Sequence, residues 1–161
     1  MKPDTIYVAE HEGVNVIRMI GDVRLTLCLS FDAFIDHVLS QENFKSVVFD
    51  LTQARAIDST TLGLMAKIAI LGQRKQHPKP VVISSDAGIT RLLVSMGFED
   101  IFDIVDHANL ALQADTPLAA NTEQEDVIKD TIINAHKTLS QMNDQNEQTF
   151  KELISTLETY Q

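Results

Sequence analysis

The chain has 161 residues, 44% of them hydrophobic and 22% charged, which suits one compact domain or one domain with an appendage. Its formal net charge of −10 opposes binding to nucleic acid or to an anionic membrane surface, because both require clustered Lys and Arg. No apolar run approaches the roughly 20 residues that cross a bilayer, and the N-terminus lacks the apolar stretch of a signal peptide, so we expect a cytoplasmic protein whose partner is another protein.

The first fifty residues predict a strand pair, a helix and a buried strand. Ile6–Val8 and Val14–Ile20 are expected to form a hairpin that turns near Gly13. A helix with Ser30 as its N-cap should follow. The continuous apolar run Val47–Leu51 is typical of a strand covered on both faces. The helix is indicated by apolar residues at spacings of three and four, namely Phe31, Phe34, Ile35, Val38 and Leu39.

The next sixty residues continue the alternation of helix and strand. Leu62–Leu71 predicts a helix that is apolar nearly all round and therefore deeply buried. Val81–Ser84 is the next expected strand, and a helix after it should end at Gly97. Phe102–Val105 and Ala108–Ala114 predict a last short strand and a short helix.

This order predicts an α/β fold, in which a mixed sheet has helices packed against it and helical crossovers join its parallel strands. Residues 1–114 are expected to form that domain, and residues 115–121 a linker.

Residues 122–161 predict a long amphipathic helical extension. They contain no Gly or Pro, and an interrupted heptad seam indicates one long helix or two helices hinged near Asn143–Asn146. Such a helix is not stable alone in water. We expect it to dock on its own domain or to pair with a second copy, giving a homodimer. The seam consists of Ile128, Ile132, Ala135, Leu139, Met142, Phe150, Leu153, Leu157 and Tyr160.

The segment between the buried strand and the buried helix is the candidate site. The strand is expected to end at Leu51, a loop to follow, and the helix to begin near Thr60 with Asp58 or Ser59 as its N-cap. A helix N-terminus offers unpaired backbone N–H groups and partial positive charge. It therefore accommodates a phosphate on Ser59, whereas a partner shaped to the bare hydroxyl meets roughly −1.5 to −2 of added charge.

The same segment resembles the STAS domain of bacterial anti-sigma-factor antagonists. The similarity lies in Asp50–Thr52, a strand ending in an Asp-Leu-Ser-like triplet, followed by Ile57–Gly63, which resembles the family's Asp-Ser-Ser/Thr-Gly-Leu-Gly helix start. It continues through Val81–Ser84, Arg91–Leu93 and Met96–Phe98, and covers roughly residues 5 to 113.

The resemblance implies a partner switch that regulates transcription. Ser59 would be phosphorylated by a serine kinase, often the anti-sigma factor itself. Its bare form would bind the anti-sigma factor and free a sigma factor, and a cognate phosphatase would reset the switch. No cofactor or enzymatic activity is implied.

Two positions differ from the family pattern. Thr61 replaces a glycine, and Gly21–Arg24 replaces Gly-Glu-Leu-Asp, so that Arg24 stands where an acidic residue is usual. We expect the partner surface to consist of Asp22, Arg24, Asp58, Ser59, Thr60 and Thr61, with Thr60 and Thr61 as secondary phosphate acceptors.

Other interpretations are weaker. In the first, the protein is a non-enzymatic STAS scaffold subunit of a signalling or transport assembly, and Ser59 is only a helix cap. A hydrolase would need a Gly-x-Ser-x-Gly elbow, which is missing, and no motif ties a histidine to Ser59.

A metal site at Asp103, Asp106 and His107 has little support. Cys28, the one cysteine, stands among apolar residues and is expected to be a buried hydrophobe.

Overall fold

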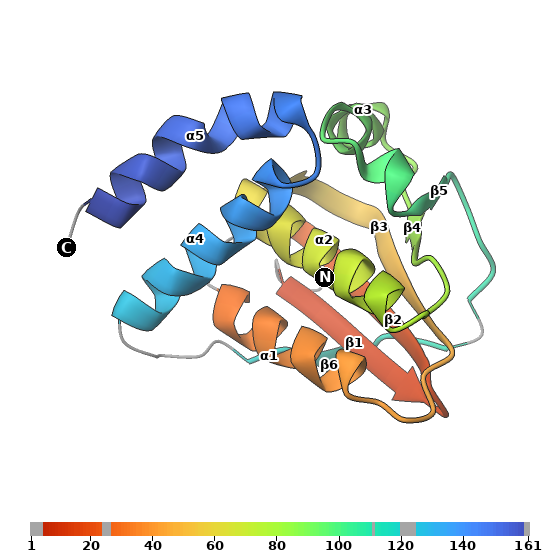
Figure 1. Ribbon diagram of the computed structural model, residues 1–161. Coiled ribbons are helices and arrows are strands. Elements are labelled where there is room, and N and C mark those ends of the chain that lie inside the picture. The colour runs from red at the N-terminus through yellow and green to blue at the C-terminus, as the bar shows by residue number, and fades with distance from the viewer. Residues whose placement is uncertain (1–4, 24–26, 111, 120–124, 160–161) are drawn as a thin grey trace.

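The computed structural model describes residues 5–23, 27–110, 112–119 and 125–159. Its centre is a sheet of six strands in the order β5-β4-β3-β2-β1-β6 (Figure 1). The strands are β1 (Thr5–His11), β2 (Val14–Val23), β3 (Ser46–Ile57), β4 (Val81–Ile83), β5 (Asp103–Val105) and β6 (Thr116–Pro117).

The sheet is mixed, as the sequence predicted. Strands β2, β3, β4 and β5 run parallel to one another, whereas β1 is antiparallel to both of its neighbours, β2 and β6. The parallel pairs need crossover connections, which helices supply. The α/β fold class is therefore confirmed.

The helices lie in two layers outside the sheet. Helices α1 and α2 pack beside each other over one face, and α4 packs across α2 as an outer layer (Figure 1). Helix α5 turns back along α4, so the extension is a pair of helices with its break at residues 141–143. The helices are α1 (Cys28–Leu39), α2 (Ser59–Arg74), α3 (Ala87–Ser95), the 3-10 turn η2 (Phe98–Asp100), α4 (Glu125–Ser140) and α5 (Asp144–Thr159).

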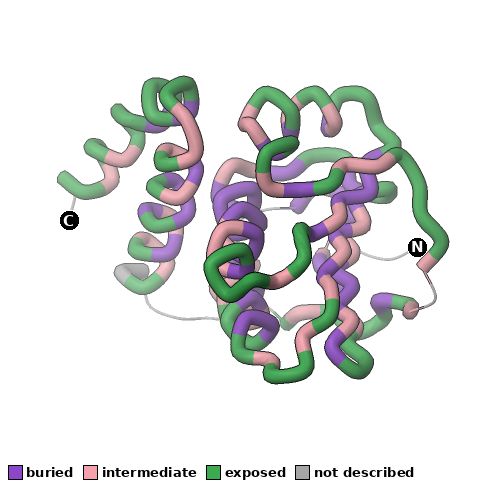
Figure 2. The backbone as a smooth tube through the Cα atoms, turned by 45° about the vertical axis from the view of Figure 1, so that its right-hand side comes forward, coloured by how far each residue is buried: buried purple, intermediate pink, exposed green. Residues whose placement is uncertain are grey.

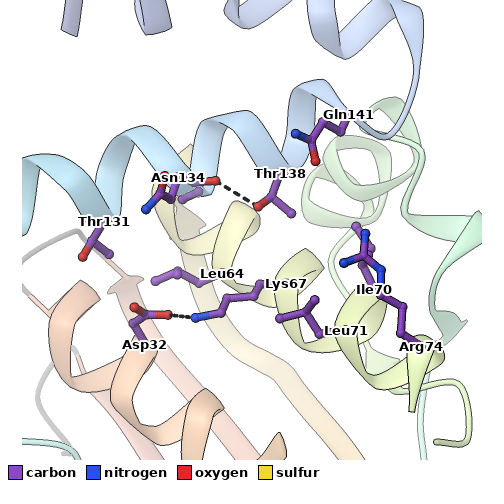
Figure 3. Close-up of a pocket in the computed structure, with 11 residues that line it drawn as sticks. Asp32, Leu64, Lys67, Ile70, Leu71, Arg74, Thr131, Asn134, Thr138 and Gln141 are labelled. Carbon is purple, nitrogen blue, oxygen red and sulfur yellow. Dashed lines mark hydrogen bonds and ion pairs between the residues drawn. The ribbon is translucent and has the colours of Figure 1, made fainter. Parts of the chain in front are cut away.

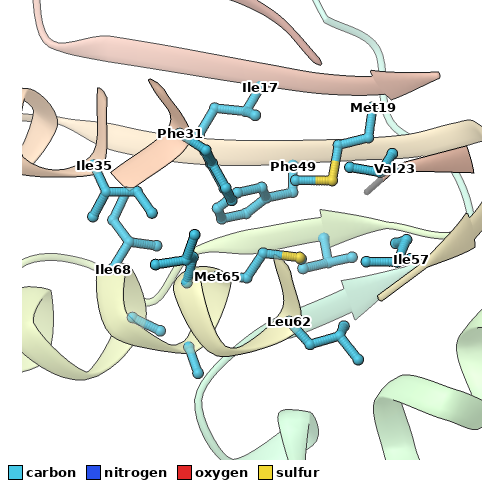
Figure 4. Packing of buried hydrophobic residues seen from close by; sticks show 14 of the residues in the cluster. Ile17, Met19, Val23, Phe31, Ile35, Phe49, Ile57, Leu62, Met65 and Ile68 are labelled. Carbon is cyan, nitrogen blue, oxygen red and sulfur yellow. The ribbon is translucent and has the colours of Figure 1, made fainter. Parts of the chain in front are cut away.

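Strand β2 shows how the sheet separates two apolar clusters. Its side chains point alternately to the two faces. Ile17 and Met19 face the helices and join Phe49 and Met65 in the main core (Figure 4). Val16 belongs to a smaller cluster on the opposite face, with Tyr7, Ile20 and Ala114. Most of the apolar burial thus lies between the sheet and α1–α2, which holds α2 firmly in place.

Three local predictions were wrong. Strand β3 does not end at Leu51 but runs to Ile57, because the second half of β2 supplies a partner for it. Helix α1 begins at Cys28, before Ser30, without a side-chain cap. Within Ala108–Ala114 the described residues are not helical, and Leu110 and Leu112 pack on the smaller cluster instead.

Part of the expected linker has regular structure. Thr116 and Pro117 pair with β1 opposite Val8 and Tyr7. The division into 1–114, 115–121 and 122–161 otherwise stays a prediction. None of the described helices is both long and apolar enough to span a membrane.

The Cys28 thiol should react slowly in the folded protein. It is 3% exposed, and burial, with smaller contributions from the charges of Asp58 and Asp32, raises its pKa. Because the thiolate is the reactive form, we expect labelling by an aromatic disulfide reagent at pH 8 to be at least about tenfold slower than in the unfolded chain. Absorbance of the released thiol measures both rates, and equal rates would contradict the burial of Cys28.

Candidate functional site

The junction of β3 and α2 positions the predicted switch residue. Asp58 has extended backbone angles, and its carboxylate accepts a hydrogen bond of 2.8 Å from the Thr61 backbone N–H, which makes it the N-cap of α2. The Asp58 backbone N–H donates to the Val23 carbonyl at 3.3 Å, so the end of β2 is joined to the start of α2. Ser59 is consequently the first residue of the helix, one position earlier than expected.

The three neighbouring hydroxyl residues differ in exposure. Thr60 and Thr61 are only 4% and 2% exposed, whereas Ser59 is partly exposed. Helix α2 is buried along most of its length, because the sheet lies on one side of it and α4 on the other (Figure 2). Of the three residues, Ser59 is thus the one that the fold covers least.

The Ser59 side chain contacts a histidine from the extension. Its Oγ lies 2.7 Å from Nε2 of His136 on α4, 77 positions later in the chain. The other ring nitrogen, Nδ1, lies 2.7 Å from the Ile132 carbonyl oxygen, which can only accept. In the neutral ring Nδ1 therefore carries the hydrogen, and Ser59 donates its hydroxyl hydrogen to Nε2.

The histidine is enclosed. His136 is 2% exposed, and the ring of Phe150 from α5 packs edge-on against it with ring centroids 5.2 Å apart. Ala135 and Leu139, which flank it on α4, belong to the main core together with Phe150. The hydrogen bond from Ser59 is thus made inside a packed helix–helix contact.

Gly63 allows α4 to come this close. A Cβ atom at this position would lie 2.2 Å from the Ala135 carbonyl oxygen and 2.6 Å from its carbon. The obstacle is backbone, which cannot rotate away as a side chain can. Only glycine at this position permits the observed approach of the two helices.

A cavity of about 250 Å³ interrupts the same contact farther along α2 (Figure 3). Lys67 lies at its edge, with Nζ bonded to Asp32 and, at 3.0 Å, to Asp36. Burial lowers the pKa of Lys67, but hydrogen bonding to the two carboxylates outweighs it, and the pKa is raised overall. The lining residues include Leu64, Leu71 and Arg74 from α2, and Thr131, Asn134, Thr138 and Gln141 from α4 and its end.

The remaining predicted residues are only partly brought together. Asp22 lies at the end of β2, beside Val23, and forms an ion pair of 3.5 Å with Arg55. Arg24 lies outside the described residues. Of the expected partner surface, the structure therefore describes Asp22 and the segment Asp58–Thr61.

The postulated metal site is not supported by the geometry. Asp106 and His107 bond to each other at 2.8 Å and are both exposed, while Asp103 lies 3.7 Å from Lys79. Within the part of the chain that the structure describes, no three His, Cys, Asp or Glu side chains converge on one point.

His136 was not among the residues predicted for the site. No sequence motif links it to Ser59, because the two meet only when α4 docks. One signal was available: His136 follows Ile132 by four positions and adjoins Ala135, so it belongs to the face of α4 that carries the apolar seam.

Solved structures with the same fold are found by structural comparison. The anti-sigma factor antagonist SpoIIAA in its unphosphorylated form aligns with a TM-score of 0.54 and 12% identity, over 64% of this chain and 89% of that one. A candidate anti-sigma factor antagonist from Thermotoga maritima gives 0.55 and 16%, over 63% and 86%. An anti-sigma factor antagonist from Mycobacterium paratuberculosis gives 0.52 and 20%, over 66% and 90%.

The chain has the fold of anti-sigma factor antagonists. The predicted STAS-like architecture is thereby confirmed. At identities of 12–20% the likeness concerns the fold, and it leaves the roles of individual residues as predictions. A scan against protein-family models finds no match, and neither does a search of curated protein sequences.

Two glycine substitutions in α2 test the contact with α4. We expect Gly63→Ala to lower the free energy of unfolding by about 1–3 kcal/mol, because its Cβ would overlap the Ala135 backbone. Gly72→Ala is the matched control, since its Cβ would meet His77 at an ordinary 3.5 Å. Alanine is the better helix former by about 1 kcal/mol, so this variant should be as stable as wild type or more stable.

Urea unfolding monitored by circular dichroism measures both variants. If Gly63→Ala stabilised the protein as much as Gly72→Ala, α4 would not lie against Gly63 in solution.

Proposed function

We propose that the protein is an anti-sigma factor antagonist whose binding to its partner is controlled by phosphorylation of Ser59. The observation that carries this proposal is the position of Ser59. Ser59 is the partly exposed hydroxyl residue at the N-terminus of α2, in a domain that shares its fold with anti-sigma factor antagonists. The protein acts in the cytoplasm, by binding and without catalysing a reaction.

The partner surface in this proposal is the start of α2 together with the end of β2. Asp58 and Ser59 lie at its centre, Asp22 lies at the side of β2, and the buried Thr60 and Thr61 support it from below. Arg24, which is outside the described residues, stays a predicted member of this surface. The chain's net charge of −10 favours a partner with a basic face. The partner is an anti-sigma factor, and it or a separate serine kinase phosphorylates Ser59.

A phosphate at Ser59 would affect the domain and the partner differently. The helix N-terminus tolerates negative charge, so α2 remains folded. A partner packed against the bare hydroxyl loses its fit and faces roughly −1.5 to −2 of new charge beside the Asp58 carboxylate. Phosphorylation therefore releases the partner, and a phosphatase restores binding.

One observation favours a scaffold instead. The Ser59 hydroxyl already has a structural role, because it donates to the buried His136. In that case the hydrogen bond only fastens α4 to the domain, and Ser59 is never modified.

The Ser59–His136 pair does not favour a hydrolase. A serine nucleophile needs a base with room beside it for a substrate carbonyl and for oxyanion donors. His136 is covered by Phe150 and 2% exposed. A hydrolytic activity lost in Ser59→Ala would contradict this interpretation.

A pull-down from native lysate tests the proposed switch. Wild type, Ser59→Ala and Ser59→Asp serve as baits, and the captured proteins are identified by mass spectrometry. We expect an anti-sigma factor or kinase-like protein to bind wild type and Ser59→Ala, and to be reduced about tenfold or more on Ser59→Asp, because the added carboxylate repels it.

Ala87→Asp is the matched control. Ala87 is exposed and follows the N-cap Asp86 of α3, as Ser59 follows Asp58. This variant adds the same charge at the first position of a different helix, so it should still capture the partner. If all four baits captured the same proteins in the same amounts, the scaffold function would replace the switch.

A further inference from the structure

Helices α4 and α5, called the cover below, occupy the surface that the proposed function assigns to the partner. Helix α4 crosses the first turns of α2, and its Ala135 backbone lies against Gly63, four residues after Ser59 (Figure 1). Nε2 of His136 accepts a hydrogen bond from the Ser59 hydroxyl, with 2.7 Å between Nε2 and Oγ. An external helix that binds the start of α2 would need the place that α4 already occupies.

In the docked state His136 of the cover occupies the place next to the Ser59 Oγ. The Ser59 Oγ is in direct contact with Nε2 of His136, and that ring is enclosed by Phe150. A phosphoryl group replaces the donated hydrogen with a phosphorus atom and three further oxygens. It also brings negative charge beside the Asp58 carboxylate, which already caps α2. The histidine and the phosphate cannot both occupy the space next to Oγ.

The contact between the cover and α2 combines a closely packed part with a part that is not filled. Its apolar part consists of Ala135, Leu139 and Phe150, which are buried, and of Ile128, Met142 and Ile154, which are only partly buried. The cavity of about 250 Å³ between α2 and α4 leaves part of the contact unfilled (Figure 3). An outer layer whose contact is incompletely filled opens at a lower free energy than the main core does. The cover can therefore separate from α2 while the sheet and α1–α2 stay folded.

We propose that the cover is an intramolecular competitor for the partner surface and that it, like the partner, recognises the bare Ser59 hydroxyl. In the docked state it withholds Ser59 from both the kinase and the anti-sigma factor. A phosphate on Ser59 excludes the docked state. This inference rests on the proposed function for its biological meaning, but the coupling between Ser59 and α4 is a property of the isolated chain.

Amide hydrogen exchange of the full chain measures that coupling without a partner. The wild type is compared with protein carrying phosphoserine at position 59, introduced during synthesis. We expect residues 127–140 of α4 to exchange at least about tenfold faster in the phosphorylated protein, while β2 and β3 exchange at an unchanged rate.

Phosphoserine at position 85 is the control for added charge. Ser85 is exposed and precedes the N-cap of α3, at the opposite end of that helix from Met96, whose carbonyl accepts a hydrogen bond from Asn146 of the cover. It should leave exchange in α4 as in the wild type. If phosphoserine 59 left α4 as protected as in the unmodified chain, the coupling would be absent and the inference overturned.

A substitution on the cover alone tests the competition. Ala135→Arg places a charged side chain in the contact and leaves α2 and Ser59 unchanged, whereas Thr156→Arg adds the same charge at an exposed position of α5. We expect Ala135→Arg, but not Thr156→Arg, to speed exchange in α4 and to increase both partner capture and Ser59 phosphorylation by native lysate with ATP severalfold.

The two proposals fail in different ways. If exchange in α4 responds to phosphoserine 59 but the lysate neither modifies Ser59 nor distinguishes Ser59→Asp, the cover is coupled to Ser59 and the phosphorylation switch is wrong. If the partner distinguishes the baits but Ala135→Arg captures no more of it than wild type, the switch stands and the cover does not compete.

Discussion

The burial of α2 between two layers is the constraint on which the rest of the structure depends. On one side the helix packs on the sheet through residues such as Met65, which is completely buried. On the other side α4 approaches so closely that Gly63 has no space for a Cβ atom. A helix enclosed in this way cannot shift along its axis without disturbing both layers. Its first turn, and with it Ser59, is therefore held in one position.

Rigidity of this kind matters for a switch that acts through a single hydroxyl. A partner that recognises a bare serine needs that serine in one place, and Asp58 fixes it by capping α2 and by bonding to the end of β2. The same fixed geometry makes a small covalent change effective, since packed contacts do not deform gradually to admit a phosphate. The proposed partner and α4 would bind the same surface at the start of α2, so they would compete for it.

The cover differs from the domain in how it is stabilised. The domain buries large side chains against each other, such as Phe31 and Phe49, whose ring centroids are 6.3 Å apart. These side chains pack on a sheet whose neighbouring strands are joined by backbone pairing, as β2 and β3 are. The cover depends on the apolar seam of α4 and α5, one buried histidine and a contact that a cavity interrupts. We therefore expect the cover to separate from α2 before the sheet and the helices α1 and α2 unfold.

The sequence by itself determined the elements whose signals are local. The alternation of strands and helices up to β5 and the glycine that ends α3, Gly97 with φ of 85°, depend on neighbouring residues and were predicted correctly. The cap of α2 was narrowed to Asp58 or Ser59, of which Asp58 is the one observed. The seam of residues 122–161 likewise predicted an amphipathic extension, with a pair of helices as one of its two expected forms.

Only the tertiary structure decided what depends on distant partners. Strand β3 continues to Ile57 because β2 lies beside it, and hydrogen bonds between strands far apart in the chain leave no local pattern. His136 meets Ser59 across 77 positions, because α4 folds back over α2. An apolar stripe shows that a helix must pack, but the choice between its own domain and a second copy depends on the shape of the available surface. Here Gly63 provides the close approach that admits α4.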